Sequence, residues 1–369
     1  MKIVVFGLTI SSSWGNGHAT LWRGLCRALA RQGHNVVFFE KDVPYYAGNR
    51  DLFEVPGGAL VLYDSWESIR TRARSEIADA DVAMVTSYCP DGIAATDLVL
   101  EAGRAARVFY DLDTPVTFSR LQANEPLSYI GPRGLRDFDL VLSYTGGLAL
   151  ERLQTELGAK RVAPLYGHVD PEIHRPTQPV GHYVSDLSYL GTYAADRQAT
   201  LERLFIEPAG LRASRRFLIG GAQYPQDFPW RENIAFVQHL PPSEHPAFFS
   251  SSRLTLNVTR QAMAEMGWCP SGRLFEASAC GAPILSDVWE GLDSFFEPGR
   301  EILIAETTEE AVSALDLTDE ELKRIAKASR ERTLEEHTSE RRAKELENLI
   351  SSATSSLPSD DNSAAMMEA

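Results

Sequence analysis

The sequence predicts an α/β fold with two doubly wound parallel-sheet domains that face a central cleft. Three observations lead to this prediction. Short apolar runs rich in valine and aromatic residues alternate with helical patterns, this alternation occurs twice along the chain, and its 369 residues are about what two domains require. Repeated strand–helix units are typical of parallel sheets with helices on both faces.

The first series of strand–helix units occupies residues 1–167. Its expected strands show no clean polar alternation, which is typical of strands buried on both faces. The helix expected over 19–32 has Leu21, Leu25 and Leu29 four residues apart, and Gly33 follows where a C-terminal cap belongs. The strands expected in this series are 2–8, 35–40, 59–64, 81–87, 107–111 and 139–144.

The pattern breaks at "YGHVDPEIHRPTQPVGHY" (166–183), where prolines and histidines occur without periodicity. We therefore expect a linker over 168–184, followed by a second domain over 185–335. A helix over 336–350 is expected to pack back on the first domain, and 351–369 is expected to be a disordered tail because it has few apolar residues. The strands expected in the second domain are 187–192, 216–221, 234–240, 254–259, 282–287 and 301–306.

Charge and composition exclude some classes of protein. The formal net charge of −15 disfavours a nucleic-acid partner or an anionic lipid surface, since both require clustered Lys and Arg. The N-terminal run "MKIVVFGLTI" lacks the features of a signal peptide, and no apolar stretch has the length of a membrane helix. We therefore expect a cytoplasmic protein without integral membrane segments. Neither disulfides nor a zinc site is indicated by the four scattered cysteines, Cys26, Cys89, Cys269 and Cys280.

The loop after the first expected strand, "TISSSWGNGHATLW" (9–22), is long for a strand–helix connection. Gly15 and Gly17 would let the backbone approach a ligand, and His18 could donate to a phosphate or sugar oxygen or act as a base. The loop could also be simply a solvated Ser/Gly segment. A competing interpretation is a dinucleotide fingerprint, with Thr20 at its third glycine position and Glu40 as the ribose carboxylate.

A pair of carboxylates ends another strand of the first domain, in "FYDLDTPVTF" (109–118). Asp111 and Asp113 could bind sugar hydroxyls, hold a metal or supply a base. The alternative is a turn capped by aspartate and fixed by proline. Of the two, we favour Asp113 as the site residue.

The second domain offers basic and acidic residues just after its strands. Gly191 permits close approach of a phosphate, while Arg197 and Arg260 could bind a diphosphate, although each could be an ordinary surface arginine. In "GRLFEASACGAPILSD" (272–287), a helix is expected to begin near residue 271 and to place Arg273 and Glu276 on one face. They could form an intrahelical salt bridge. They could equally hold the phosphates and the ribose hydroxyls of a nucleotide at the helix N-terminus.

These segments resemble a known family. "RLFEASACGAPILSD…GLDSFFEPGREILI" is similar to the C-terminal signature of nucleotide-sugar glycosyltransferases with the GT-B architecture of two Rossmann-like domains. The likeness is greatest to the spore-maturation-type (CgeB-like) glycosyltransferase group, to which "SWGNGHAT", "DLDTP" and "YGHVDPEIHRP" are also similar. The resemblance extends from about residue 10 to about residue 305.

The resemblance implies a hexosyltransferase that uses a nucleoside-diphosphate sugar, such as a UDP-sugar, and no other cofactor. Glu276 would bind the ribose hydroxyls, and Gly191 and Arg197 would meet the diphosphate. The acceptor would lie against the first domain, near His18 and Asp113. One departure is clear: the wider retaining group has a second Glu eight positions before the ribose Glu, where this chain has Trp268.

The chemistry expected from these residues is metal-independent glycosyl transfer, with retention favoured over inversion. Gly15, Gly17, Arg260 and Arg273 complete the expected donor site, and His18, Asp113 and Arg197 are the expected catalytic residues. The acceptor could be a glycan, a protein, a lipid or a small metabolite. Two alternatives stay open: a nucleotide-sugar epimerase or NAD-dependent oxidoreductase, and a non-catalytic carbohydrate-binding protein of the same fold.

Overall fold

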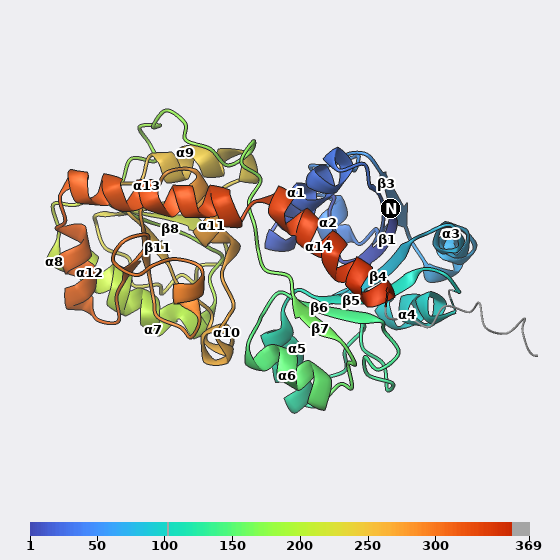
Figure 1. Ribbon diagram of the computed structural model, residues 1–369. Coiled ribbons are helices and arrows are strands. Elements are labelled where there is room, and N and C mark those ends of the chain that lie inside the picture. The colour runs from blue at the N-terminus through green and yellow to red at the C-terminus, as the bar shows by residue number, and fades with distance from the viewer. Residues whose placement is uncertain (102, 356–369) are drawn as a thin grey trace, which may run out of the picture.

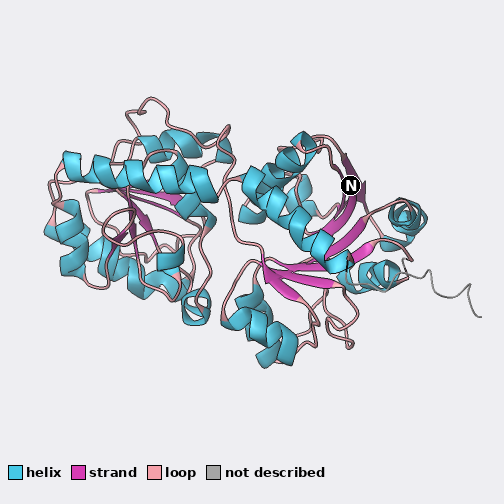
Figure 2. Cartoon of the chain, in the orientation of Figure 1, coloured by secondary structure: helices cyan, strands magenta, loops and turns pink. Residues whose placement is uncertain are grey.

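The computed structural model describes residues 1–101 and 103–355. The chain forms two lobes, each built around a parallel sheet with helices on both faces (Figures 1 and 2). The predicted fold class is therefore confirmed. All twelve expected strands occur within two residues of their predicted bounds, because most of them are short runs of buried apolar side chains.

The first domain contains a seven-stranded sheet, as far as the described residues show, in the order β3-β2-β1-β4-β5-β6-β7. The seventh strand was not expected, since it has only three residues and none is fully buried. The strands are β1 (Lys2–Gly7), β2 (Asn35–Lys41), β3 (Ala59–Tyr63), β4 (Val82–Thr86), β5 (Ala106–Asp111), β6 (Leu140–Ser143) and β7 (Val162–Pro164). The helices are α1 (Gly17–Arg31), α2 (Pro44–Ala47), α3 (Trp66–Ala78), α4 (Gly92–Leu100), α5 (Thr114–Gln122) and α6 (Leu148–Thr155).

The second domain has a six-stranded sheet among the described residues, in the order β10-β9-β8-β11-β12-β13. Its strands are β8 (Leu187–Leu190), β9 (Phe217–Gly221), β10 (Ile234–Gln238), β11 (Thr255–Asn257), β12 (Ile284–Ser286) and β13 (Leu303–Ile304). Its α-helices are α7 (Gln198–Leu201), α8 (Glu207–Leu211), α9 (His245–Ser250), α10 (Gln261–Met266), α11 (Gly272–Ala279), α12 (Thr308–Leu315) and α13 (Asp319–Glu336). Short turns of other helix types are η1 (Ala195–Arg197), η2 (Glu202–Ile206), η3 (Pro242–Glu244) and η4 (Leu292–Ser294).

The chain crosses between the domains twice, and the two crossings pair with each other. The backbone N–H of Val169 donates to the carbonyl oxygen of His337 at 3.0 Å, and the N–H of Ser339 donates to the carbonyl oxygen of Val169 at 2.8 Å. The second crossing joins α13 to α14 (Ser339–Thr354), which reaches over to the first domain (Figure 1). A narrow paired connection of this kind is suited to act as a hinge.

Helix α14 packs against α1, and its buried side chains belong to the core of the first domain. It ends at Thr354, so the expectation of disorder from residue 351 onward was wrong for its first residues, since Ala353 is buried in that core. Residues 356–369 of the expected tail lie outside the described residues. None of the helices in the described part of the chain has the length and apolar content needed to cross a membrane.

Candidate active site

A cleft of about 670 Å³ lies between the two domains, at the carboxyl ends of their strands. In each sheet the strand order reverses beside the first strand of the domain, at β1 and at β8. Ligands bind in α/β sheets at such points because the loops on either side diverge there. The structure brings all nine residues of the predicted site to this cleft: Gly15, Gly17, His18, Asp113, Gly191, Arg197, Arg260, Arg273 and Glu276.

The loop between β1 and α1 is held in place by Glu40. This carboxylate is 1% exposed and accepts hydrogen bonds from the backbone N–H groups of Ile10 (2.8 Å) and Ser11 (2.9 Å) and from the hydroxyl of Thr9 (2.7 Å). A buried carboxylate with these partners is not available to a ribose hydroxyl. The role that the dinucleotide alternative requires of Glu40 is therefore not supported by the geometry.

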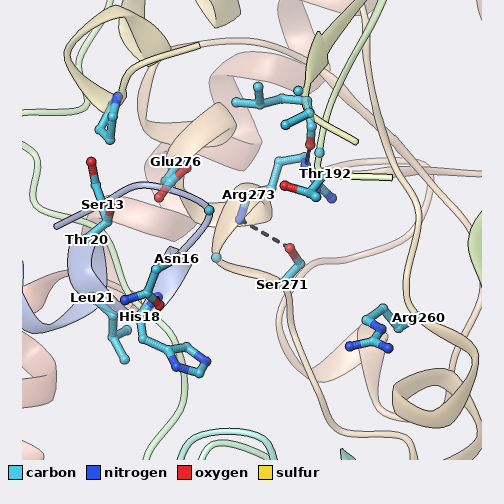
Figure 3. Close-up of a pocket in the computed structure, with 18 of the residues that line it drawn as sticks. Ser13, Asn16, His18, Thr20, Leu21, Thr192, Arg260, Ser271, Arg273 and Glu276 are labelled. Carbon is cyan, nitrogen blue, oxygen red and sulfur yellow. Dashed lines mark hydrogen bonds between the residues drawn. The ribbon is translucent and has the colours of Figure 1, made fainter. Parts of the chain in front are cut away.

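The same loop directs α1 toward the cleft. Gly15 has a φ of +60°, a conformation that disfavours a side chain. Asn16 then caps the helix, because its side-chain oxygen accepts the backbone N–H of His18 at 3.1 Å. Asn16 and His18 consequently lie on the first-domain side of the site (Figure 3).

His18 and Asp113 form a pair across that wall. The Nε2 atom of His18 lies 3.2 Å from Oδ2 of Asp113, and each side chain is about one-fifth exposed. Burial alone would lower the pKa of His18, but the carboxylates of Asp113 and, more weakly, Asp111 outweigh this and raise it. The imidazolium form is thus favoured beside Asp113.

The two aspartates after β5 have different surroundings. Asp111 is completely buried, accepts the backbone N–H of Asp113 at 3.1 Å, and its pKa is raised to about 6 by burial. Asp113 lies at the start of α5 and lines the cleft. Asp113 thus faces the cleft, whereas Asp111 is buried in the turn before α5.

Arg273 is fixed on the opposite wall, in the first turn of α11. Its Nε donates to the carbonyl oxygen of Leu190, and its Nη1 donates to Oδ1 of Asn257 at 2.8 Å. A Cβ atom at Gly191 would approach Nη2 of Arg273 to 3.0 Å, so the glycine leaves room for the guanidinium. Burial lowers the pKa of Arg273, but an arginine remains cationic at neutral pH.

Glu276 lies one turn further along α11, with a side chain that is 16% exposed. Among the described residues its ion-pair partners are His174 and His245, so the possible salt bridge to Arg273 is not formed. Burial would raise the pKa of Glu276, but the two histidines and Arg273 hold it at about 2. The carboxylate is therefore ionised and faces the cleft.

The other two arginines differ in how they are held. Arg197 donates from Nη1 to the carbonyl oxygen of Thr192 at 3.3 Å, and its buried Nε has no hydrogen-bond partner among the described residues. Arg260 is 41% exposed and pairs with Asp196 at 3.2 Å. It lies away from Arg273 in Figure 3. Arg197 is thus better placed to gain from a bound anion, whereas Arg260 already has a carboxylate partner.

Sequence reasoning missed several residues of the cleft. Trp14 contacts His239 across the cleft, with ring centroids 3.6 Å apart and the rings tilted by 41°, and so joins the two domains. His174 and His245 flank Glu276 but come from the linker and from α9, and only the fold brings them together. The histidine-rich linker was a visible signal, but we interpreted it as a linker and as a segment similar to the CgeB-like group, and not as part of the cleft.

Trp268, which stands where the wider group has a second Glu, makes an interdomain contact. Its carbonyl oxygen accepts the backbone N–H of Gly146 at 3.0 Å, and its indole lies against Gly147, where a side chain would collide with it. This position therefore links the two domains.

Comparisons with known proteins agree with this architecture. Residues 197–348 match the family model described as glycosyl transferase-like. No match was found among curated proteins. Three solved structures superpose on 95–97% of the chain and on their own full length: sucrose-phosphate synthase from Thermosynechococcus elongatus (TM-score 0.68, 13% identity), HepE from Anabaena with UDP-glucose (0.66, 12%), and a DNA-modifying β-glucosyltransferase studied with and without uridine diphosphoglucose (0.61, 13%).

The fold is that of the GT-B glycosyltransferases. The family match covers the second domain, so this part of the chain is similar to glycosyl transferase-like proteins, and the chain as a whole has the fold of the GT-B structures.

Proposed function

We propose that this protein is a glycosyltransferase that takes its sugar from a UDP-sugar bound on the second domain and transfers it to an acceptor held against the first. The observation that carries the proposal is the arrangement of α11. The N-terminus of α11 lines the cleft, and so do Arg273 and Glu276, which lie one turn apart on this helix. Several structures of the same fold contain UDP or UDP-glucose, which supports uridine as the base.

The donor would be bound by groups of complementary charge. The ionised carboxylate of Glu276 can accept hydrogen bonds from both ribose hydroxyls. The diphosphate would lie against the N-terminus of α11, where backbone N–H groups and the helix dipole favour an anion. Arg273 and Arg197 would contribute the positive charge, and Gly191 would allow the phosphates to approach the backbone.

Breaking the glycosidic bond places negative charge on the departing diphosphate. Fixed cationic groups stabilise that charge without first having to reorient, which is the largest electrostatic contribution in many enzymes. We propose that Arg273, Arg197 and the helix N-terminus supply it, so that the transfer itself requires no metal. An oxygen of the departing diphosphate would then take the acceptor proton, which leads to retention at the anomeric carbon.

His18 and Asp113 would act on the acceptor side of the cleft. The imidazolium of His18, oriented by Asp113, can donate a hydrogen bond to an oxygen of the sugar or the acceptor. Trp14 and His239 meet across the cleft, and their contact would limit access of water to the donor. The acidic net charge of −15 remains an argument against a nucleic-acid acceptor.

A panel of nucleotide sugars incubated without acceptor tests this proposal, with UDP release and free sugar as the readouts. We expect slow hydrolysis of at least one UDP-sugar by the wild type. Arg273→Met should lower it by roughly 100- to 1,000-fold, as loss of one transition-state donor does elsewhere. Arg300→Met is the control, because Arg300 is an exposed arginine paired with Glu297 outside the cleft.

The other outcomes separate the alternatives. Binding of UDP-sugars without turnover would indicate a carbohydrate-binding protein, and an altered sugar still attached to UDP would indicate an epimerase. Binding of NAD in place of UDP would reject the proposal. The anomeric configuration of the transferred sugar, read by NMR, tests retention, and an inverted product would assign the base to His18 and Asp113.

A further inference from the structure

His174, His245 and Glu276 form a cluster whose geometry donor binding does not explain. They come from the segment after β7, from the first residue of α9 and from α11. Nδ1 of His245 lies 3.5 Å from Oε2 of Glu276, and Nε2 of His174 lies 3.9 Å from Oε1. One ligand atom from each of the three residues lies within 4.8 Å of the other two.

The polar atoms of the two imidazoles are poorly satisfied. His174 is 2% exposed, and neither of its ring nitrogens has a hydrogen-bond partner among the described residues. Nδ1 of His245 is likewise buried without one. At 3.9 Å, His174 is too far from Glu276 for a hydrogen bond. Leaving such a nitrogen unpaired costs about 1–3 kcal/mol, so a missing partner is the simplest explanation.

The chemistry of the cluster indicates what that partner is. Two imidazole nitrogens and one carboxylate oxygen form a ligand set that suits Zn²⁺ and similar transition metals, while Mg²⁺ and Ca²⁺ prefer oxygen ligands alone. Bond lengths of 2.0–2.1 Å in a tetrahedral site place neighbouring ligand atoms roughly 3.4 Å apart. The three ligand atoms lie within 4.8 Å of one another, so side-chain rotations that draw them together would complete the site.

The position of the cluster leaves room for a further ligand. His245 and Glu276 also line the cleft, which leaves the fourth coordination position open to solvent or ligand. The three residues are held by separate parts of the second domain and its linker, so they are positioned before any ligand binds.

We propose that His174, His245 and Glu276 bind a divalent transition metal of the zinc class, and that this metal competes with the nucleotide for Glu276. The first half of the proposal is independent of the proposed function, and the second half rests on it. A metal here takes the carboxylate oxygens that the ribose would use, so it regulates donor binding and takes no part in the transfer.

Calorimetric titration of the untagged full chain with ZnCl₂ tests the metal site. We expect one saturable site, binding at least 10-fold weaker in His174→Ala and in His245→Ala, and unchanged binding in His239→Ala, which removes another histidine of the same cleft. Titration with MgCl₂ should show no such site. Circular dichroism establishes that each variant is folded, and Co²⁺ in place of Zn²⁺ should give the visible spectrum of a tetrahedral complex.

A second titration, of UDP in the presence and absence of Zn²⁺, tests the competition. Zn²⁺ should raise the dissociation constant of UDP in the wild type, and this increase should be at least 10-fold larger than in His174→Ala. The variant keeps Glu276, so any effect that remains in it measures direct binding of Zn²⁺ to UDP. Equal weakening would overturn the competition. Zinc binding that is absent, or that survives both histidine substitutions, would overturn the site. Normal zinc binding with no UDP binding at all would instead count against the proposed function.

Discussion

The surroundings of Glu276 come from distant parts of the chain. The carboxylate lies on α11 beside two histidines and faces the cleft that also contains Arg273. Local sequence indicated an acidic group near a helix N-terminus. It could not indicate His174 and His245, because they are 102 and 31 residues away along the chain.

Replacing Glu276 by Gln tests its assignment to the ribose. Hydrogen bonds to a charged group are worth roughly 1.5–3 kcal/mol, so we expect UDP to bind about 10- to 150-fold more weakly. Glu265→Gln is the matched control, since Glu265 is exposed and bonded to Gln261. Calorimetry with UDP provides the measurement, and equal affinities for the wild type and Glu276→Gln would remove this residue from the donor site.

The pair of His18 and Asp113 predicts a pH dependence. The carboxylate raises the pKa of His18 against the effect of burial. In Asp113→Asn only burial and the weaker influence of Asp111 remain, so the pKa should fall, which an NMR titration of the imidazole measures. In the wild type, kcat/KM should decrease as the pH rises through this pKa, because the imidazolium is the donating form. A rise in kcat/KM over that range would indicate that His18 acts as a base.

At the scale of elements, α14 connects the two domains. It begins at the paired crossing of residues 169 and 338 and inserts Ala343, Leu346 and Ile350 into the core of the first domain. The helix thus ties the end of the second domain to the first. A helix was expected over residues 336–350, but its extent depended on which side chains α1 covers.

Leu346→Ala tests the contribution of α14. The leucine is 1% exposed, and truncation of a buried leucine costs about 2–5 kcal/mol. We expect a clear decrease in the melting temperature of the first domain, which scanning calorimetry measures. The exposed neighbour Lys344→Ala should leave it unchanged. If both variants melt like the wild type, α14 contributes little to that core.

Elements that depend on neighbouring residues could be predicted from the sequence, whereas contacts between distant residues could not. The strands and α1 were predictable because the apolar pattern of consecutive residues indicates a buried strand or an amphipathic helix. Strand β7 was missed since three half-buried residues carry almost no pattern. The contact of Trp14 with His239, and the interdomain role of Trp268, depend on how the domains meet, which no local pattern specifies.

In the whole molecule, the proposed reaction requires a donor that binds between two domains joined by a narrow hinge. Nine predicted residues from both domains line one cleft because every loop concerned follows a parallel strand, and parallel strands end at one edge of their sheet. Their gathering at the cleft could be predicted from the sequence. Their individual roles depend on where a donor binds.

A crystal structure of the chain with a bound UDP-sugar would show where the donor lies. We expect ribose hydroxyls on Glu276, diphosphate oxygens on Arg273 and the first turn of α11, and the sugar turned toward His18 and Asp113. A donor bound outside the interdomain cleft, or with its diphosphate away from α11, would contradict this expectation.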